Sequence, residues 1–492
     1  MARHQQLFRA GRYVEALPVI EQAVELAAQF RESDFRRTDS TGKLAMTLDY
    51  LGRFDEAAKL YNEILERIRA NPGNELASTG LLRSIGRIHV LKHRFKDAEG
   101  FYQEAQKIDE TMLDPNDSGR VEGLASMVDL YLAQGRHSEA KPYAERAVAL
   151  VKSVPGETLL HARALQAMAW VYMGFRLFDQ AQPLLERILR ISEQNFGSNG
   201  PQTAPAVENL AALYLMTGNK AEAGKYFRRV LTINEKALGP EHPAVASNIN
   251  DLALTLDYDK DAEEVESLLT RSLQITTKRF GSSSPNLAMP LMNIGTFYSR
   301  TGKADEAERY LRRAVDVTQM EEQARDSVFA MHALSNLAGL LRDQKKFTEA
   351  ERLASRALEI AEKKNGADDR MIAGQCRLLA EVYSVMEEHP KAVALSERAV
   401  TITEKNPGAN TPDHGASLVA LARALTGAKE FEKAEPLYLQ AIKIFEEKGP
   451  AASIAFALRK YAELLESTNR SAEAAKLRNR ADELSPEKRN PK

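Results

Sequence analysis

The sequence has little cysteine, no long apolar run and almost no net charge. Its single cysteine, Cys376, excludes an internal disulfide and any cysteine cluster that holds zinc or an iron–sulfur centre. No stretch of about 18 apolar residues is present, which argues against a membrane-spanning helix. Charged residues make up 28% of the chain, yet the formal net charge is only −2, so acids and bases are interspersed. No field of one sign therefore steers nucleic acid or an anionic membrane toward the protein.

Signatures of catalysis and metal binding are also missing. The sequence contains no Gly-x-Ser-x-Gly elbow, no Gly-x-x-x-x-Gly-Lys-[Ser/Thr] phosphate loop and no His-Glu-x-x-His pair. His89 and His93 stand four residues apart, but His89 occupies a position that is often tyrosine in the other repeats, which favours packing over metal binding. Cys376 falls at a core-facing position, where we expect an inert buried thiol. We therefore predict a protein that is not an enzyme and that binds no metal or cofactor.

A repeat is what the sequence does contain. One residue, small in nearly every repeat, recurs every 40 to 43 residues near the start of a predicted second helix, and we call it the anchor of its repeat. The twelve anchors are Ala16, Ala57, Ala98, Ala140, Ala181, Ala223, Val265, Ala307, Ala350, Ala392, Ala434 and Ala474. These units predict one continuous array over residues 1–484, followed by a polar tail at 485–492. Self-similarity at a fixed period is the sequence sign of a solenoid.

Each unit reads as two helices joined by a turn. In the repeat around Ala223, Ala211 and Tyr214 precede the anchor by twelve and nine residues, and Phe227 follows it by four. Spacings of three, four and seven place such residues on one helical face, and Gly218 breaks the helix between them. Helices are predicted at 203–217 and 220–237, and links rich in proline and glycine join the units. The pattern predicts an all-α fold, an α-solenoid whose helix-turn-helix units stack in a right-handed superhelix.

The pattern resembles the tetratricopeptide repeat, through its small residues, its tyrosine before the turn and turns such as Gly52-Arg-Phe-Asp-Glu-Ala57. The unit of about 42 residues, with Leu238-Gly-Pro-Glu-His-Pro243 followed by Asn248-Ile-Asn-Asp-Leu-Ala253, is similar to the kinesin light chain subclass. That resemblance implies a scaffold that binds peptide segments of partner proteins on the inner surface of the superhelix. It also implies that asparagines of the first helices grip the peptide backbone. No heptad region that would join a motor heavy chain is present, so a motor-adaptor role does not follow, and we favour the bacterial scaffolds that share such units.

The positions that match those asparagines lie fourteen residues before the anchor, in the middle of the chain. They are Asn209, Asp251, Asn293 and Asn336, with Asn250 one residue earlier in its unit. An amide side chain offers a donor and an acceptor, so a row of them can satisfy the backbone of an extended peptide. The alternative is that they bond to a neighbouring helix and fix the stacking. The corresponding residues elsewhere are not amides, which favours a local groove, expected to span residues 163–342.

Other side chains are expected to assist this row of amides. Four or five hydrogen bonds contribute roughly 2–7 kcal/mol, against an association cost of about 4–15 kcal/mol. Trp170, the only tryptophan, is expected to form an anchoring pocket with Met173, or alternatively to be a partly buried packing residue. Arg163, Arg300 and Arg342 also map toward the inner face, where they either receive a carboxylate of the peptide or are paired within the array.

The expected partners are proteins or peptides, without nucleic acid or a membrane. An alternative function is a self-associating structural array or a regulatory module of an enzyme complex. The first ten residues lack the apolar core of a secretory signal and, in the repeat register, begin within a helix. A natural short cap and the loss of an upstream segment, such as an export signal, both explain that start. A cytoplasmic location is expected, with a periplasmic or secreted one as the alternative.

Overall fold

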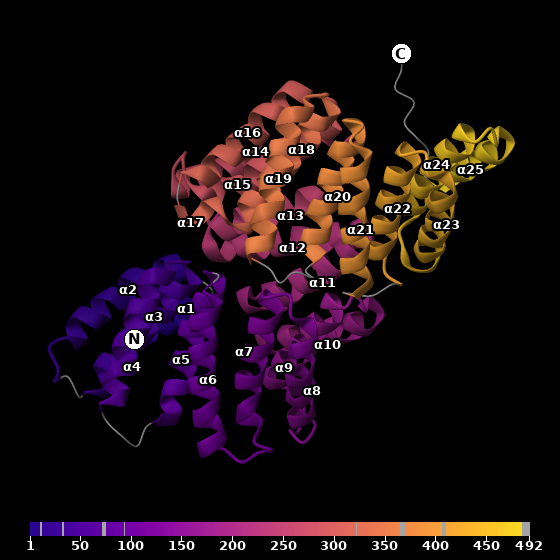
Figure 1. Cartoon of the computed structure of the whole chain (residues 1–492). Coiled ribbons are helices and arrows are strands. Elements are labelled where there is room, and N and C mark those ends of the chain that lie inside the picture. The colour runs from indigo at the N-terminus through magenta and orange to yellow at the C-terminus, as the bar shows by residue number, and fades with distance from the viewer. Residues whose placement is uncertain are drawn as a thin grey trace. The chain divides into compact units, whose positions relative to one another are not determined.

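The computed structural model of the chain is helical, and its residues divide into two compact units (Figure 1). Unit 1 is Met1–Leu256 and unit 2 is Asp257–Lys492. The structure describes residues 1–9, 12–31, 34–70, 75–92, 94–320, 322–364, 370–405 and 410–484, and within these ranges no residue is in a β-strand. The polar tail predicted at 485–492, Gly11 and His93 lie outside the described residues.

Unit 1 is a stack of antiparallel helix pairs. The pairs are α1 (Ala2–Arg9) with α2 (Tyr13–Ala27), α3 (Phe35–Tyr50) with α4 (Phe54–Arg69), α5 (Glu75–Leu91) with α6 (Phe95–Met112), α7 (Val121–Ala133) with α8 (His137–Val151), α9 (Leu159–Gly174) with α10 (Phe178–Phe196), and α11 (Ala204–Met216) with α12 (Lys220–Leu238). The last helix of the unit is α13 (Pro243–Thr255), and one-turn 3₁₀ segments, Ser118–Arg120 and Pro201–Thr203, precede α7 and α11. Each helix packs on the next along the chain, which is the nearest-neighbour arrangement of a solenoid.

Unit 2 repeats the same arrangement. It begins with α14 (Ala262–Phe280), which packs on α15 (Ala288–Arg300). The pairs that follow are α15 with α16 (Ala304–Gln319), α18 (Val328–Asp343) with α19 (Phe347–Lys364), α20 (Arg370–Val385) with α21 (His389–Thr403), α22 (Pro412–Gly427) with α23 (Phe431–Lys448), and α24 (Ala451–Ser467) with α25 (Ser471–Leu484). A short helix, α17 (Glu322–Arg325), lies between α16 and α18. The prediction of an all-α helical-repeat solenoid is confirmed.

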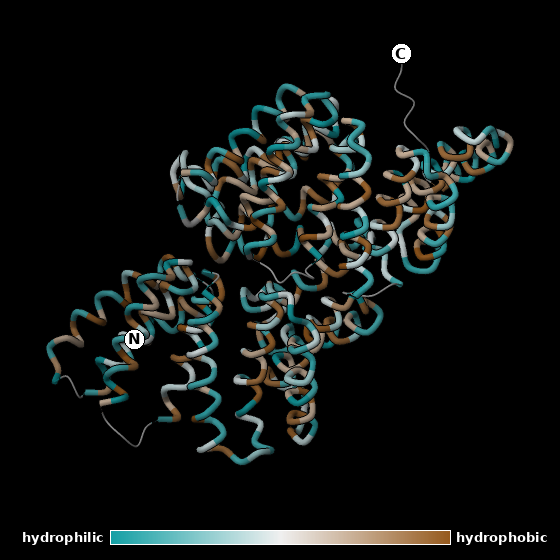
Figure 2. The backbone as a smooth tube through the Cα atoms, in the orientation of Figure 1, coloured by the Kyte–Doolittle hydropathy of each residue, from teal (hydrophilic) through white to brown (hydrophobic). Residues whose placement is uncertain are grey.

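The anchors are the points of closest helix packing. All twelve anchors are 0% exposed. The residue twelve positions earlier faces the anchor's helix so closely that glycine is needed in two repeats. A Cβ atom at Gly86 would lie 2.4 Å from the ring of Tyr102, and one at Gly295 would lie 2.6 Å from Leu311 Cγ. Figure 2 shows hydrophobic and hydrophilic residues alternating along the helices, as expected for helices that each bury one face.

In nine of the described pairs, the turn between the two helices has the same conformation whatever the residue type. The residue five positions before the anchor has a positive φ angle at Gly52, Gly135, Arg176, Gly218, Gly302, Lys345, Glu387, Lys429 and Asn469. The amide after it bonds back to the carbonyl nine before the anchor, as from Asn219 to Tyr214 at 2.9 Å and from Lys346 to Leu341 at 2.8 Å. This is the bond that closes a helix in a Schellman motif, and it satisfies a carbonyl at the helix end.

The repeat around Val265 departs from this turn. Its helix α13 ends at Thr255, and Leu256 is extended, with ψ at 156°. The residue five before the anchor, Lys260, does not have a positive φ angle. Instead, the carboxylate of Asp257 accepts bonds from the amides of Asp259 and Lys260 at 3.0 and 3.4 Å. The Schellman turn is therefore replaced by an aspartate-capped one at the junction between the two units.

The close packing beside the anchors predicts opposite effects at two glycines of unit 2. Gly295→Ala inserts a methyl group against Leu311 and is expected to lower the stability by about 1–3 kcal/mol, because overpacking displaces a neighbour. Gly339→Ala, on α18, has no heavy atom within 4 Å of the added Cβ and should raise it by roughly 0.5–1 kcal/mol through helix propensity. Denaturant and thermal unfolding of both variants measures this. A Gly295→Ala protein as stable as the parent contradicts the packing argument.

Candidate functional site

The first helix of each pair presents one face that carries the residues seven or eight, eleven, fourteen or fifteen, and eighteen positions before the anchor, and we call it the first-helix face. In unit 1, this face of α5, α7 and α9 lines a hollow of about 440 Å³. In unit 2, the same face of α20, α22 and α24 lines a hollow of about 300 Å³. Among the predicted site residues, Arg163 lines the hollow of unit 1, and none is among the residues that line the hollow of unit 2.

The hollow of unit 1 is lined mainly by charged side chains that already have partners. Arg163 donates to Asp129 at 2.6 Å and to Glu122 at 3.3 Å. Two further arginines of this face, Arg83 and Arg87, pair with Asp109 and Asp49 respectively. The alternative left open by the sequence, pairing within the array, therefore describes Arg163.

The predicted amides differ in their surroundings. Asn209 and Asn293 are half-buried and Asn336 is exposed, and none of these three described side chains makes a hydrogen bond within the protein. Asn250 is only 3% exposed, and its Oδ1 atom has no partner among the described residues. Asn250 is thus a buried side chain, whereas the other three leave donors and acceptors for a ligand.

Two of the bonds between neighbouring first helices join the residue fifteen positions before one anchor to the residue seventeen positions before the next. The amide of Asn248 donates to Glu208 at 3.5 Å, and the hydroxyl of Ser335 donates to Gln375 at 2.6 Å. Because these residues join adjacent repeats, the asparagines fourteen residues before the anchor are not required for stacking. That observation weighs against the alternative that Asn209 and Asn293 only fix the stack.

Asp251 lies in an unusual electrostatic setting on α13. It is half-buried near Glu208 of α11, and no basic side chain of the described residues forms an ion pair with either carboxyl group. Burial, with the nearby charge of Glu208, raises the pKa of Asp251 to about 7. Burial likewise raises the pKa of Glu208. The pair favours a cationic or hydrogen-bond-donating neighbour.

The remaining site residues of unit 1 lie on α9. Trp170 is half-buried, so part of its indole ring is accessible. Met173, the proposed companion, packs against the hydrophobic cluster that includes Ala169 and Leu185. Trp170 therefore remains a candidate contact for a ligand, while Met173 supports the core beneath it.

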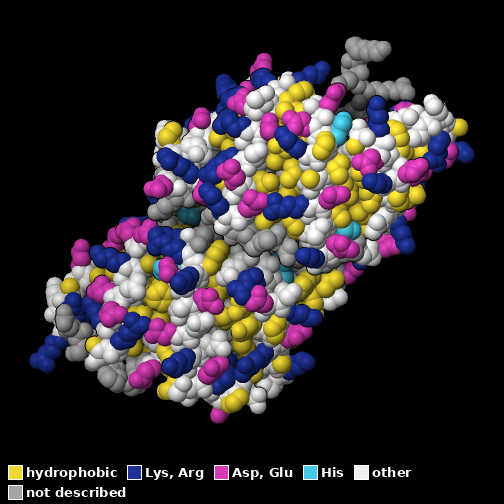
Figure 3. Space-filling view, in the orientation of Figure 1, with side chains coloured by type: hydrophobic (Ala, Val, Ile, Leu, Met, Phe, Trp, Pro, Cys, Tyr) yellow, Lys and Arg dark blue, Asp and Glu magenta, His cyan; other side chains and the backbone are white. Residues whose placement is uncertain are grey.

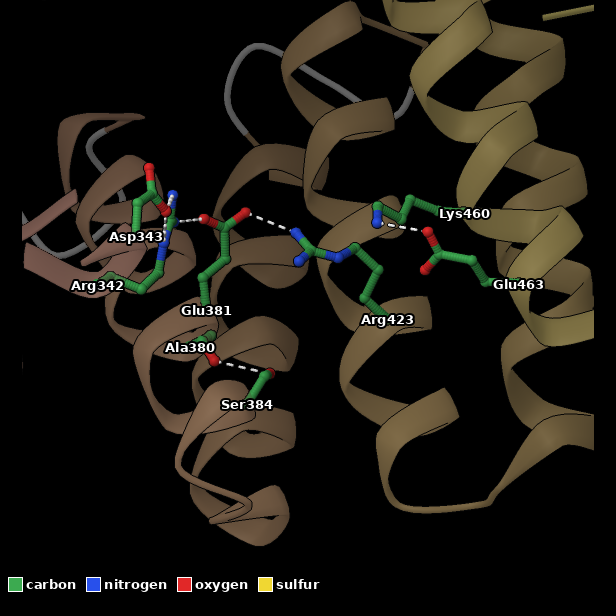
Figure 4. Close-up of polar contacts among 8 residues, drawn as sticks. All are labelled: Arg342, Asp343, Ala380, Glu381, Ser384, Arg423, Lys460 and Glu463. Carbon is green, nitrogen blue, oxygen red and sulfur yellow. Dashed lines mark hydrogen bonds and ion pairs between the residues drawn. The ribbon is translucent and has the colours of Figure 1, made fainter. Parts of the chain in front are cut away.

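The first-helix face of unit 2 carries a row of ion pairs (Figure 4). Arg342 of α18 donates to Asp343 at 2.9 Å and to Glu381 of α20, and Glu381 also accepts from Arg423 of α22 at 2.7 Å. On α24, Lys460 donates to Glu463 at 2.6 Å. Arg342 is consequently paired within the array, as the sequence alternative allowed. Arg300 differs, because its exposed guanidinium lies 4.7 Å from the ring centre of Tyr258.

Sequence reasoning missed Arg377 on α20. Its Nη1 atom donates to the hydroxyl of Ser417 at 3.0 Å, and it forms no ion pair with any described residue. Burial lowers the pKa of this arginine. In the sequence Arg377 is one more arginine at a first-helix position, so only the structure distinguishes it from the paired Arg163 and Arg342.

The remaining sequence predictions concern Cys376, His89, metal binding and membrane-spanning helices. Cys376 is 0% exposed, and burial raises the pKa of its thiol to about 11, as expected for an inert buried cysteine. The ring of His89 stacks on Phe101 with centroids 5.3 Å apart, which is a packing role. The residues that the structure describes hold no group of three or more metal-binding side chains. Over the same residues, no helix combines the length and the apolar character needed to span a bilayer.

Comparison with protein families matches almost the whole chain. The family described as the MalT-like TPR region matches residues 5–255, which is unit 1. The chain belongs to the tetratricopeptide repeat proteins. Further tetratricopeptide repeat families match residues 259–320 and 371–447, and residues 331–370, within unit 2. The break between matches at 255–259 coincides with the atypical turn after α13.

Relatives of this tetratricopeptide repeat protein include kinesin light chain-like proteins. The Arabidopsis thaliana protein KINESIN LIGHT CHAIN-RELATED 1 is 24% identical over 220 residues, which cover 44% of this chain and 36% of that protein. The chain thus matches about a third of the length of that relative. The crystal structure of BtubC (BKLC) from P. vanneervenii is 22% identical, with a TM-score of 0.38, and the match covers 47% of this chain and 91% of that one. A putative kinesin light chain of Podosopora anserina is also 22% identical, with a TM-score of 0.37, over 42% of this chain and 97% of that one.

The raised pKa of Asp251 predicts a pH-dependent stability. Its ordinary pKa is 3.8 and its folded value is about 7, so the fold favours the protonated acid, and stability falls as pH rises between these values. Asp251→Asn should therefore raise the unfolding free energy at pH 8, by up to about 4 kcal/mol, and flatten this pH dependence. Chemical denaturation between pH 4 and 8 measures it, with Glu21→Gln, an exposed acid on α2, as control. An Asp251→Asn protein with an unchanged pH profile would refute the assignment.

Proposed function

We propose that the first-helix faces of the two units bind extended peptide segments of partner proteins, without catalysis. The observation that carries this proposal is the set of asparagine side chains on those faces that have no partner within the protein, Asn209 in unit 1 and Asn293 in unit 2. Membership of the tetratricopeptide repeat family supports it, because such repeats serve as scaffolds for protein–protein interaction. The family is typically non-catalytic, which agrees with the absence of catalytic motifs in the sequence.

The chemistry of a half-buried amide explains why these positions suit a peptide backbone. Each asparagine offers an acceptor oxygen and two N–H donors, which match the C=O and N–H groups of an extended chain. A polar group that is partly removed from water without a partner lowers stability, and a ligand that supplies the partner recovers that free energy. Main-chain bonds of this kind hold a segment without reading its sequence, so specificity must come from side-chain contacts.

Apolar and charged contacts supply the remaining affinity. Trp170 in unit 1 offers an accessible indole ring, and aromatic side chains carry a large share of the binding energy at interfaces. In unit 2, Arg300 remains exposed beside Tyr258 and can approach an acidic side chain of the partner. On the face shown in Figure 3, basic and acidic side chains are interspersed, which favours a partner with local charge complementarity over a uniformly charged one.

The proposal predicts selective loss of binding in asparagine variants. A segment captured from cells by the purified chain is located by cross-linking and mass spectrometry, and the synthetic peptide is titrated calorimetrically. Asn209→Ala or Asn293→Ala should weaken binding by roughly 2- to 10-fold, because each removes one or two hydrogen bonds to the ligand. The melting temperature should not change, because neither side chain bonds within the protein.

Asn62 provides the matched control for that experiment. It is an exposed asparagine on the second helix α4, where its amide bonds only to the carbonyl of Ala58 at 2.9 Å. Asn62→Ala should leave peptide affinity unchanged. If Asn209→Ala and Asn293→Ala lower the melting temperature while the affinity stays at the parental value, the asparagines are structural and the proposal is wrong.

A further inference from the structure

The hollow between α20, α22 and α24 in unit 2 combines an unpaired cation with an apolar wall. Its volume is about 300 Å³, and the residues that decide its chemistry are Arg377, Glu381, Val419, Arg423, Phe445 and Phe456. All of these lie on described helices of unit 2. The hollow is separate from the asparagines proposed to bind peptides, which belong to α11, α15 and α18.

The charges that line this hollow do not balance. Glu381 accepts from Arg423 at 2.7 Å and also from Arg342, so the only carboxylate in the lining is already shared between two arginines (Figure 4). Arg377 bonds only to the hydroxyl of Ser417, through one of its nitrogens at 3.0 Å. Its other N–H groups are left for a ligand. The carboxylates of Asp413 and Glu381 act on this half-buried guanidinium only at longer range, without an ion pair or hydrogen bond, so an anion in the hollow would supply the direct contact that it lacks.

The opposite wall of the hollow is apolar. Phe456 is 45% exposed, although it lies on the face that lines the hollow. The guanidinium of Arg423 lies 5.8 Å from its ring centre, and Phe445 and Val419 also line the hollow. Covering the ring of Phe456 with an apolar group removes its surface from water, at a gain of roughly 25 cal/mol per Å².

The main-chain contacts expected for a bound peptide are missing here. The residues fourteen positions before the anchor on α20, α22 and α24 are Leu378, Ala420 and Lys460, and none of them is an amide. An extended peptide would therefore find no row of amides, one from each repeat, to pair with its backbone C=O and N–H groups. The hollow therefore suits a compact ligand that is recognised by its charge and its apolar body.

We propose that this hollow binds a small amphipathic monocarboxylic acid. Its carboxylate would accept hydrogen bonds from the Arg377 guanidinium, and its apolar body would cover Phe456 and Val419. A volume of about 300 Å³ accommodates about 10–15 non-hydrogen atoms, at the lower end of ligand-site sizes. The lining residues Arg377, Arg423 and Glu381 carry one excess positive charge, which matches one carboxylate, and Lys460, 5.9 Å from the ring centre of Phe456, is already paired with Glu463.

Calorimetric titration of the full chain with 4-phenylbutyrate tests the proposal. One equivalent should bind, and the neutral 4-phenylbutanamide should bind at least about tenfold more weakly, because it lacks the charge that Arg377 recognises. Arg377→Gln should weaken 4-phenylbutyrate binding by roughly 10- to 100-fold. Arg377→Lys should retain an intermediate affinity, since it keeps the charge but not the fork of donors. Phe456→Ala should also weaken binding, by loss of the apolar contact.

Matched controls keep the result interpretable. Arg352→Gln removes an exposed arginine of α19, outside the hollow, and should leave binding unchanged. The helical circular dichroism signal and melting temperature of each variant establish that it is folded, and Phe456→Ala tests the same hollow if Arg377→Gln does not fold. The proposal is overturned if the acid and its amide bind equally, if Arg377→Gln binds like the parent, or if no saturable binding occurs at millimolar concentration. Binding of inorganic phosphate with higher affinity, or of a peptide with a terminal phenylalanine carboxylate but not the free acid, also overturns it.

Discussion

The close approach of two helices at the anchor is the contact on which the rest of the fold depends. Each anchor has no exposed surface, and in most repeats the residue twelve positions earlier is alanine or glycine, so the two helices of a pair approach closely. Large residues then fill the space on either side. Because the same contact recurs about every 42 residues, each pair stacks on the next and the structure needs no central core.

This contact explains how much of the fold the sequence could predict. Anchors, helix pairs and their boundaries follow from residue size and spacing, and the helices predicted at 203–217 and 220–237 occur as Ala204–Met216 and Lys220–Leu238. The turn is harder to predict from the sequence, because its residue is not always glycine. Arg176, Lys345 and Glu387 also have positive φ angles there, with the same amide–carbonyl bond closing the helix. The aspartate-capped turn after α13 could not be recognised, because other repeats also lack glycine there and still form the ordinary turn.

The sequence indicates which residues share a helix face, but it does not indicate which of them form ion pairs. The repeat register places Arg163, Arg342 and Arg377 on the first-helix face equally well. Whether each meets a carboxylate depends on side chains about 40 residues away, whose reach and rotamer the sequence does not encode locally. Arg163 meets Asp129 and Glu122, and Arg342 meets Glu381, while Arg377 meets only a serine hydroxyl. The same limit applies to Asn250, where a shift of one residue along the helix turns a surface amide into a buried one.

The two hollows therefore differ in what they can recognise, although the same repeat builds both. In unit 1, Arg83, Arg87 and Arg163 all have carboxylate partners, so an incoming anion would have to displace an existing ion pair. In unit 2, Glu381 serves both Arg342 and Arg423, Arg342 also pairs with Asp343, and Arg377 forms no ion pair with a described residue. Displacing a half-buried ion pair leaves a charge unpaired, whereas binding to an unpaired guanidinium removes such a charge. The anion selectivity proposed for unit 2 would therefore come from the absence of an ion pair at Arg377, and the number of arginines on a face would not determine it.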